Sequence, residues 1–327
     1  MKVLVTGANG FLGSWLCRAL AQDGHDVFVL VRKGSDLSEL DGIKCQYIYG
    51  DVTDTQSVLR ATNGMETVFH LAGVIAYKKS ERQLMERVNV QGTANIVDAC
   101  LENGVPKLVY LSSVVAVGAS FTPKQVLNEN STYNIAHLDL GYFQTKHEAE
   151  LLVLKAHRER GLDVVILNPS TIYGGGDAKK GSRKTQVKVA QGKFPFYLSG
   201  GVNVVAVEDV IAGIISAWKK GRSGERYILA GENITIRELF SMIAKAAGQK
   251  EPQYLIPTWL IHLLGIVGDF LSLLGLKGGI SRENAYTATM YHWFDNSKAK
   301  TELNFDPKPA QYAINNSVQW MKENGII

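Results

Sequence analysis

The chain begins Met1-Lys-Val-Leu-Val-Thr-Gly-Ala-Asn-Gly-Phe-Leu-Gly13, and this stretch decides the fold. Residues 2–5 form a short apolar run, rich in β-branched side chains, that is typical of a buried parallel strand. Glycines follow at positions 7, 10 and 13, and apolar residues then recur at helical spacing. Strand, glycine turn and helix, in this order, predict a dinucleotide-binding turn at the start of an α/β fold.

Each glycine of this turn has a mechanical task. Gly7 makes the tight turn, Gly10 allows the backbone to approach a pyrophosphate, and Gly13 lets the helix pack closely on the strand. The phosphates would contact unpaired N–H groups at the positive end of the helix. A plain strand-to-helix turn is the alternative interpretation, but the flanking strand and helix favour dinucleotide binding.

The composition is that of an ordinary globular protein. The chain has 327 residues, of which 46% are hydrophobic and 20% charged, enough for one large α/β unit and a smaller partner. A formal charge of +4, without a Lys/Arg block, does not suggest nucleic-acid binding. Cys17, Cys45 and Cys100 are far apart, which indicates reduced thiols and no metal site. No apolar leader precedes the first strand, so we expect a cytoplasmic protein.

The end of the second predicted strand bears on the choice of nicotinamide cofactor. Residues 26–31 read Asp-Val-Phe-Val-Leu-Val and are followed by Arg32. Arg32 stands roughly 20 residues after the glycine turn, where a carboxylate would hydrogen-bond the adenosine ribose of NAD. Arg32 instead offers two parallel hydrogen bonds to a 2′-phosphate, so the sequence predicts NADP, with NAD as the alternative. A solvated basic turn is the other interpretation of Arg32.

Two further strand ends are candidates for cofactor contact. After a strand at 45–49, Asp51 would accept a hydrogen bond from the adenine amino group, or Thr53 and Asp54 would simply cap the next helix. A strand at 67–71 ends in small residues, Ala72-Gly73, which let a cofactor lie close to the backbone. We interpret His70, inside that strand, as a core histidine and not as a catalyst.

Serines and a Tyr–Lys pair follow the fifth predicted strand, residues 107–111. Ser112 and Ser113 stand at its carboxyl end, the edge on which open α/β sheets bind ligands. Downstream, Tyr142 and Lys146 are i and i+4, so on a helix they share one face. A phenol with a pKa of about 10 is a poor acid–base group at neutral pH, and an adjacent ammonium favours its anionic form. The pattern predicts a proton-transferring tyrosine; a surface helix pair is the alternative.

Several stretches of residues 1–230 occur in the same order as in one known protein family. They are Thr6-Gly-Ala-Asn-Gly-Phe-Leu-Gly13, Leu71-Ala-Gly73, Asn89-Val-Gln-Gly-Thr93, Ser112-Ser113, Tyr142-x-x-x-Lys146 and Asn168-Pro-Ser-Thr-Ile-Tyr-Gly174. Together they resemble the extended short-chain dehydrogenase/reductase family. Within it the chain is similar to dihydroflavonol-4-reductase-like proteins and to the hopanoid-associated epimerase/reductase group. That closer similarity rests on Val31-Arg32-Lys33-Gly-Ser-Asp36, Asn168-Pro-Ser170 and Gly224-Glu-Arg-Tyr-Ile-Leu-Ala-Gly231.

The resemblance implies a role for each polar side chain. Tyr142 would be the acid/base, Lys146 would hold the nicotinamide ribose and lower the tyrosine pKa, and Ser113 would orient the substrate oxygen. Thr145 replaces a common serine, and residues 207–210 lack the usual preceding histidine, but neither departure touches this chemistry. The expected cofactor contacts are Gly7, Asn9, Gly10, Phe11, Leu12, Gly13, Arg32, Asp51, Val52, Leu71, Ala72, Gly73, Lys146, Asn168 and Ser170.

The expected fold is α/β: a Rossmann-type doubly wound parallel sheet with a smaller, mainly α-helical C-terminal substrate domain. We assign residues 1–170 and 203–231 to a dinucleotide-binding domain, and 171–202 and 232–327 to a substrate-binding domain. Residues 201–220 resemble a helix that returns to the cofactor domain.

The most apolar stretch is residues 257–276. Its apolar runs, which His262 and Asp269 interrupt, are too short to span a bilayer. We interpret it as a helix pair over the substrate pocket, which the aromatic-rich residues 286–294 would help to line. A surface that touches a membrane to collect a lipidic substrate is the alternative. The basic residues 179–184 are interpreted as a solvated loop or, alternatively, as a lid that contacts a phosphate.

Three functions follow from these patterns. The leading one is an NADP(H)-dependent reductase of a ketone or aldehyde that acts on a hydrophobic small molecule. The second is an NAD-dependent nucleotide-sugar epimerase or dehydratase that keeps its cofactor bound. Arg32 disfavours this second function. The third is a silent redox-sensing module, which an intact Ser113, Tyr142 and Lys146 set disfavours. Predicted helices at 84–100 and 142–157 would pair in a homodimer, as they do in relatives.

Overall fold

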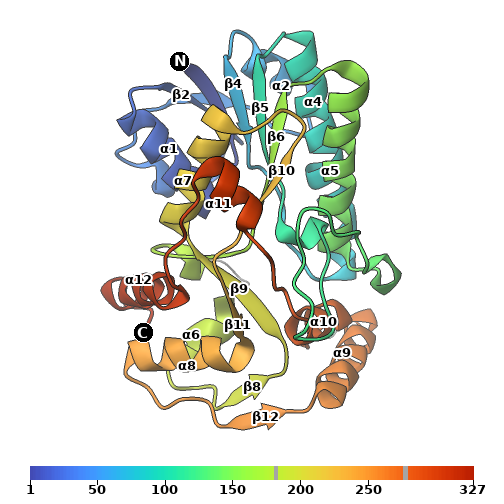
Figure 1. The fold of residues 1–327 in the computed structure, drawn as a ribbon, viewed down its shortest axis with the longest axis vertical. Helices are drawn as coiled ribbons and strands as arrows, with labels where there is room; N and C mark the ends of the chain where they lie inside the picture. Colours follow the sequence, from blue (N-terminus) through green and yellow to red (C-terminus); the bar gives the residue numbers. More distant parts are fainter. Residues whose placement is uncertain (180–182, 275–278) are drawn as a thin grey trace.

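The chain forms a parallel sheet that carries a smaller lobe of helices and short strands (Figure 1). The computed structural model describes residues 1–179, 183–274 and 279–327. The strand order of the 7-stranded sheet is β10-β6-β5-β4-β1-β2-β3, and neighbouring strands run parallel. These strands are β1 (Lys2–Thr6), β2 (Asp26–Val31), β3 (Gln46–Tyr49), β4 (Thr67–His70), β5 (Lys107–Leu111), β6 (Val164–Pro169) and β10 (Arg226–Leu229). The predicted Rossmann-type sheet is confirmed.

Helices cover both faces of this sheet, which explains why its central strands carry mainly apolar side chains. On β1, Val3 and Val5 enter one hydrophobic core and Leu4 enters the core on the opposite face. The first core lies beneath α1 (Phe11–Gln22), α7 (Val207–Lys220) and α11 (Ser297–Leu303). The second lies beneath α2 (Thr55–Thr62), α4 (Gly92–Glu102) and α5 (Gly141–Arg160). Figure 1 shows these two helix layers on either side of the strands.

The order of the strands reverses between β1 and β4. From β1 the chain passes outward to β2 and β3, and then returns to β4 on the other side of β1. Ligands of open α/β sheets bind in the crevice that such a reversal leaves at the carboxyl ends of the strands. The glycine turn after β1 and the residues after β4 lie at this crevice.

The smaller lobe contains two minor sheets, which lie in the lower half of Figure 1. One consists of β11 (Glu232–Thr235), β9 (Gly201–Ala206) and β7 (Thr171–Tyr173), and the other of β12 (Tyr254–Ile256) and β8 (Phe196–Leu198). Around them lie α6 (Lys184–Ala190), α8 (Ile236–Ala247), α9 (Thr258–Leu273), α10 (Arg282–Thr289) and α12 (Ala310–Glu323). The proposed division into domains remains a proposal.

Two predicted helices are interrupted. Residues 201–220 are not one helix, because the β-branched run of β9 pairs with β7 and β11 before α7 begins at Val207. The helix predicted at 84–100 is divided into α3 (Arg82–Met85), a π-helical turn (Glu86–Gln91) and α4. The Asn89 side chain in that turn binds the backbone of Val74 at both its N–H and its carbonyl. π-helical turns often occur at functional sites.

The apolar stretch 257–276 forms one helix where a pair was predicted. α9 continues from Thr258 to Leu273, and residues 275–278 lie outside the described part of the chain. Its partner is α10: a Cβ at Gly268 would lie 2.2 Å from the carbonyl oxygen of Ile280, and a Cβ at Gly265 3.1 Å from Ala285. In the described chain no helix is long and apolar enough to cross a membrane.

Candidate active site

The glycine turn is packed directly against the end of β4. Gly7 has a φ of 69°, and a Cβ there would lie 2.8 Å from the amide nitrogen of Ala72. A Cβ at Gly13 would lie 2.1 Å from the carbonyl oxygen of Gly7, so only glycine allows α1 to start so close to β1. Gly10 is the N-cap of α1 and offers no side chain to its N–H groups. This helix end is therefore a cradle of the kind that binds a phosphate.

The predicted adenosine contacts lie at the ends of β2 and β3. Arg32 is exposed at the end of β2, and the Asn9 side chain of the glycine turn donates to the carbonyl of Asp36 at 3.0 Å. The Asp51 carboxylate accepts hydrogen bonds from the N–H and the hydroxyl of Thr53, at 2.9 and 2.8 Å. The cap of α2 is Asp54, which accepts from the N–H of Gln56. Contacts of Arg32 and Asp51 with a cofactor stay predictions.

His70 is a core histidine, as predicted. Its ring nitrogens lie 2.7 Å from the Thr6 hydroxyl and 3.1 Å from the Thr93 hydroxyl, and the side chain is fully buried. Burial, assisted by the charge of Lys146, lowers the pKa of His70 to about 3. The ring is therefore neutral at physiological pH and links β4 to β1 and α4.

Ser113 and Tyr142 come together above the carboxyl end of β5. Ser113 is the second residue after the strand, and its side chain forms a hydrogen bond with that of Tyr142 in the first turn of α5. Burial, together with Tyr77, raises the pKa of the Tyr142 phenol above its usual value, and the bond to Ser113 opposes the shift. The rings of Tyr77 and Tyr142 meet edge to face, 6.3 Å between centroids. Tyr142 is therefore protonated at neutral pH.

Lys146 lies one turn further along α5 and is 6% exposed. Its ammonium donates to the carbonyl of Leu111 at 2.8 Å and lies 5.1 Å from the centre of the Tyr110 ring. Burial lowers its pKa to about 8, against the charge of Glu150. The expected lowering of the Tyr142 pKa by the Lys146 ammonium is not found. Burial of the phenol has the larger effect on this pKa, and the ammonium donates its hydrogen bond to the carbonyl of Leu111.

A buried polar chain supports the Ser113 loop from behind. The Asn168 side-chain nitrogen donates to the carbonyl of Ser113 at 2.9 Å and to the Glu150 carboxylate at 2.7 Å. Glu150 is fully buried and ion-paired with Arg226 on β10. Asn168 thus lies behind the Ser113 loop, and its contact with a cofactor stays a prediction. Ser170 donates to the buried side chain of Asn203 at 2.6 Å.

The remaining predicted contacts lie on the same edge of the sheet. Phe11, Leu12 and Val52 are each 8% exposed, and Leu71, Ala72 and Gly73 form the segment after β4. Ala72 donates its N–H to the Thr6 hydroxyl at 3.1 Å, which fixes that segment beside β1.

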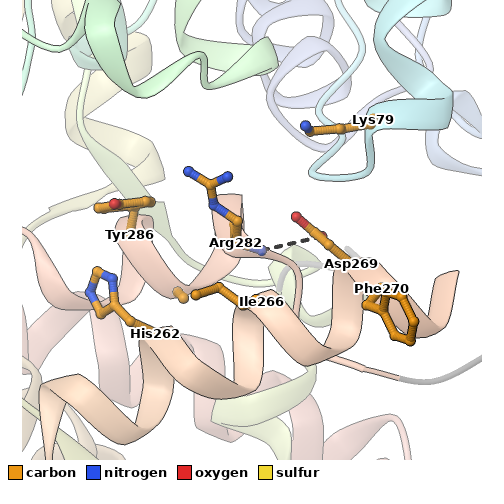
Figure 2. A pocket seen from close by; sticks show the side chains of 8 residues that line it. Lys79, His262, Ile266, Asp269, Phe270, Arg282 and Tyr286 are labelled. Carbon is orange, nitrogen blue, oxygen red and sulfur yellow. Dashed lines mark hydrogen bonds between the residues drawn. The ribbon is translucent and has the colours of Figure 1, made fainter. Parts of the chain in front are cut away.

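A cavity of about 520 Å³ lies between the loop at Lys79 and the helices α9 and α10 (Figure 2). Its walls combine apolar, aromatic and charged side chains: Lys79, His262, Ile266, Asp269, Phe270, Arg282, Ala285 and Tyr286. Tyr142 is not part of this lining, but Tyr286 packs on the same hydrophobic cluster as Tyr142. Of the aromatic-rich residues 286–294, Tyr286 lines the cavity as expected.

The basic stretch 179–184 is only partly described. Residues 180–182 lie outside the described chain. Arg183 is not solvated as expected: it is buried, its guanidinium lies 3.7 Å from the centre of the Tyr173 ring, and it contacts Asp177. Arg183 is therefore a structural residue of the lobe.

Comparison with known proteins agrees with this geometry. Residues 4–235 match the 3-beta hydroxysteroid dehydrogenase/isomerase family. The chain belongs to this family. Its members are NAD(P)-dependent extended short-chain dehydrogenases/reductases, epimerases and dehydratases that act on CH–OH and C=O groups, so the chain is an enzyme of this type.

Similar proteins match over nearly the whole chain. Sterol demethylase protein B of Methylococcus capsulatus is 32% identical and covers 100% of both chains. A putative dihydroflavonol 4-reductase of Synechocystis sp. is 30% identical and covers 99% of this chain and 95% of its own. The crystal structure of gox2253 superposes with a TM-score of 0.89 at 33% identity, over 100% of this chain and 99% of that one.

Sequence reasoning missed three residues that shape the site of this family member. Glu150 and Asn203 are buried polar residues, whose partners are distant in the sequence. Glu283 on α10 accepts the N–H of Tyr142, although the two residues are 141 positions apart. The position of Glu150, four residues after Lys146, is a sequence signal that could have predicted its place near the site. For Asn203 and Glu283 we find no such signal in the sequence.

Proposed function

We propose that the enzyme reduces a ketone or aldehyde with NADP(H), as dihydroflavonol-4-reductase-like proteins are expected to do. The hydrogen bond between Ser113 and Tyr142, with Lys146 one turn along the same helix, carries this proposal. The cradle formed by the glycine turn fits a nicotinamide dinucleotide, because Gly10 caps the helix without a side-chain hydrogen bond to its first N–H groups. When bound, the cofactor supplies or accepts a hydride.

The protein's own groups would handle the oxygen of the substrate. Ser113 would hydrogen-bond the carbonyl oxygen, and Tyr142 would donate its proton to that oxygen as the carbonyl carbon receives hydride. The Tyr142 phenol, whose pKa is raised by burial, carries a proton at neutral pH that it would give to this oxygen. Lys146 would hold the nicotinamide ribose, with its pKa lowered by burial to about 8.

The preference for NADP rests on Arg32. It is exposed beside the glycine turn, at the end of β2 where NAD-specific proteins place a carboxylate. A guanidinium there would bind a 2′-phosphate through two parallel hydrogen bonds.

We propose a hydrophobic substrate. The cavity beside α9 and α10 has Ile266, Phe270 and Ala285 in its wall, and it adjoins the site through Tyr286. The 32% identical relative is named for a sterol, a molecule of this character.

A nucleotide-sugar epimerase or dehydratase is the second candidate, because the family includes such enzymes. Lys79 and Arg282 in the cavity wall are the cations that would receive a diphosphate. That enzyme would retain NAD through its cycle, whereas Arg32 favours exchangeable NADP.

The first experiment is titration of the protein with NADPH and NADH, followed by tryptophan fluorescence. We expect much tighter NADPH binding, and then turnover on a panel of steroid 3-ketones, 2-alkyl-3-oxo acids and aryl ketones.

Tyr142→Phe should lower kcat by at least about a hundredfold and leave NADPH affinity nearly unchanged. Tyr254→Phe, 60% exposed on β12, is the matched control. Full turnover by Tyr142→Phe would contradict the mechanism, and NAD found bound after purification would favour the epimerase.

A further inference from the structure

Helix α5 carries Tyr142 and Lys146, yet its own sequence does not cap it. Leu140 is the N-cap residue and provides no side-chain hydrogen bond, and the first turn of α5 contains no acidic residue. The first N–H groups of a helix need acceptors from elsewhere, and a carboxylate is the strongest of these because of the helix dipole.

The missing acceptor comes from the smaller lobe. The Glu283 carboxylate on α10 accepts the N–H of Tyr142 at 3.2 Å and also binds the N–H of Gly141. A Cβ at Gly141 would lie 3.8 Å from the second oxygen of this carboxylate. Glu283 is itself in the first turn of α10, so its charge faces the positive ends of two helices.

A second contact from the first turn of α10 is made to Tyr77, which packs against Tyr142. Ser281 caps α10 by accepting the N–H of Asn284, and its hydroxyl donates to the carbonyl of Tyr77 at 2.8 Å. The Tyr77 ring meets the Tyr142 ring edge to face. The start of α10 therefore holds both the backbone of Tyr142 and the aromatic side chain against which its phenol packs.

The same turn of α10 borders the cavity. Arg282, Ala285 and Tyr286 lie in its wall on either side of Glu283 in the sequence, as Figure 2 shows for Arg282 and Tyr286. A molecule that fills the cavity thus contacts the element that caps the catalytic helix. Displacing α10 would remove the Glu283 carboxylate from the start of α5.

From these contacts we propose that Glu283 is a positioning residue, which holds Tyr142 in place by capping α5 from the substrate lobe. Because of this cap, the position of the Tyr142 phenol depends on how α10 packs against α5. It therefore depends also on whether the cavity beside α10 is occupied. This inference rests on the proposed role of Tyr142 as proton donor.

The test compares Glu283→Ala, which removes the acceptor, with Glu283→Gln, which keeps an amide oxygen. Glu238→Ala is the matched control, because Glu238 forms a capping box with Thr235 at the start of α8, a helix without catalytic residues. With the best ketone of the panel, Glu283→Ala should lower kcat about tenfold with unchanged NADPH affinity, and Glu283→Gln should recover most of it. Glu238→Ala should lose stability but keep its kcat.

Hydrogen–deuterium exchange provides a readout that does not depend on turnover. Glu283→Ala should speed exchange of the amides at 141–145 about fivefold or more, while Glu238→Ala leaves them unchanged. Unchanged exchange at 141–145 would overturn the capping contact. Faster exchange with a wild-type kcat would overturn the positioning role. Should Tyr142→Phe keep full turnover, the proposed function fails, whereas the exchange result still decides the contact.

Discussion

At the scale of single residues, the site depends on charges and protons that are held away from water. Burial raises the pKa of Tyr142 and lowers the pKa of Lys146 to about 8. Burial of the Lys146 ammonium therefore costs folding free energy that a hydrophobic side chain would not.

This cost predicts that Lys146→Met makes the protein more stable while abolishing turnover. Between pH 8 and 10.5 the unfolded chain binds more protons at this position than the folded chain, so wild-type stability rises with pH there. The variant lacks this rise, and below pH 8 it avoids the full cost of burying the ammonium. We expect its free energy of unfolding to exceed that of the wild type by about 1–3 kcal/mol at pH 7.

Urea unfolding at pH 7, 8, 9 and 10 measures this difference. Lys155→Met is the control on the same helix, since the Lys155 side chain is 71% exposed and ion-paired with Glu159. A Lys146→Met protein that is less stable at pH 7, or whose advantage grows with pH, would show that the ammonium stabilises the fold.

At the scale of elements, the turn between β1 and α1 is where sequence and geometry agree most closely. The Cβ contacts at Gly7 and Gly13 arise within the turn itself or with the adjacent end of β4. The structure of a short turn with few possible conformations can be predicted from its own residues, and the turn between β1 and α1 has the predicted structure.

Gly13→Ala is therefore expected to damage both binding and folding. The new Cβ would lie 2.1 Å from the Gly7 carbonyl oxygen, so α1 must shift away from β1 and its N–H groups leave the phosphate position. We expect NADPH affinity to fall at least about tenfold and stability by about 1–3 kcal/mol. Fluorescence titration and thermal unfolding measure these effects, with Arg18→Ala on the exposed side of α1 as control. Normal affinity together with a normal melting temperature would show that the turn tolerates a side chain.

Elements whose form depends on distant partners were predicted less well. The π-helical turn at Asn89 arises because its side chain binds the Val74 backbone, which local periodicity does not reveal. β9 was assigned to a helix because its pairing partners, β7 and β11, lie on either side of it in the chain. The sequence predicts Tyr142 and Lys146 on one face of a helix because their spacing within one segment fixes their relative positions, and their roles with Ser113 stay predictions. Glu283 was missed because only the packing of α10 on α5 brings it there.

At the scale of the whole molecule, the large sheet and the smaller lobe meet at the site. α10 caps α5, and the segment at 120–127 forms bridges with Tyr291 and Phe294 of the lobe. The homodimer and the domain boundaries stay predictions. Within the described residues, Leu84 and Leu151 are exposed apolar side chains on α3 and α5, where the predicted dimer helices lie.

The stability of the whole sheet should fall in acid partly through one residue, His70. Its folded pKa of about 3 lies far below the unfolded value of about 6.5, so the unfolded chain binds more protons between these values. Stability is therefore lost as the pH falls from 6.5, by up to about 1.4 kcal/mol per pH unit from this residue. The groups that face the ring are the Lys146 ammonium on α5 and the stacked Tyr110 ring on β5, and neither favours its protonation.

His70→Asn removes the titrating group and keeps a polar side chain near Thr6 and Thr93. We expect this variant to be less stable at pH 7, because an amide cannot reach both hydroxyls as the ring does, but to lose less stability between pH 6.5 and 4. Urea midpoints across that range give the slopes, and His137→Asn, at an exposed histidine, is the control. Equal acid slopes for His70→Asn and the wild type would mean that the buried ring does not cause the acid sensitivity. A shallower slope in the His70 variant alone would show that the buried ring beside Lys146 contributes to the acid sensitivity of the fold.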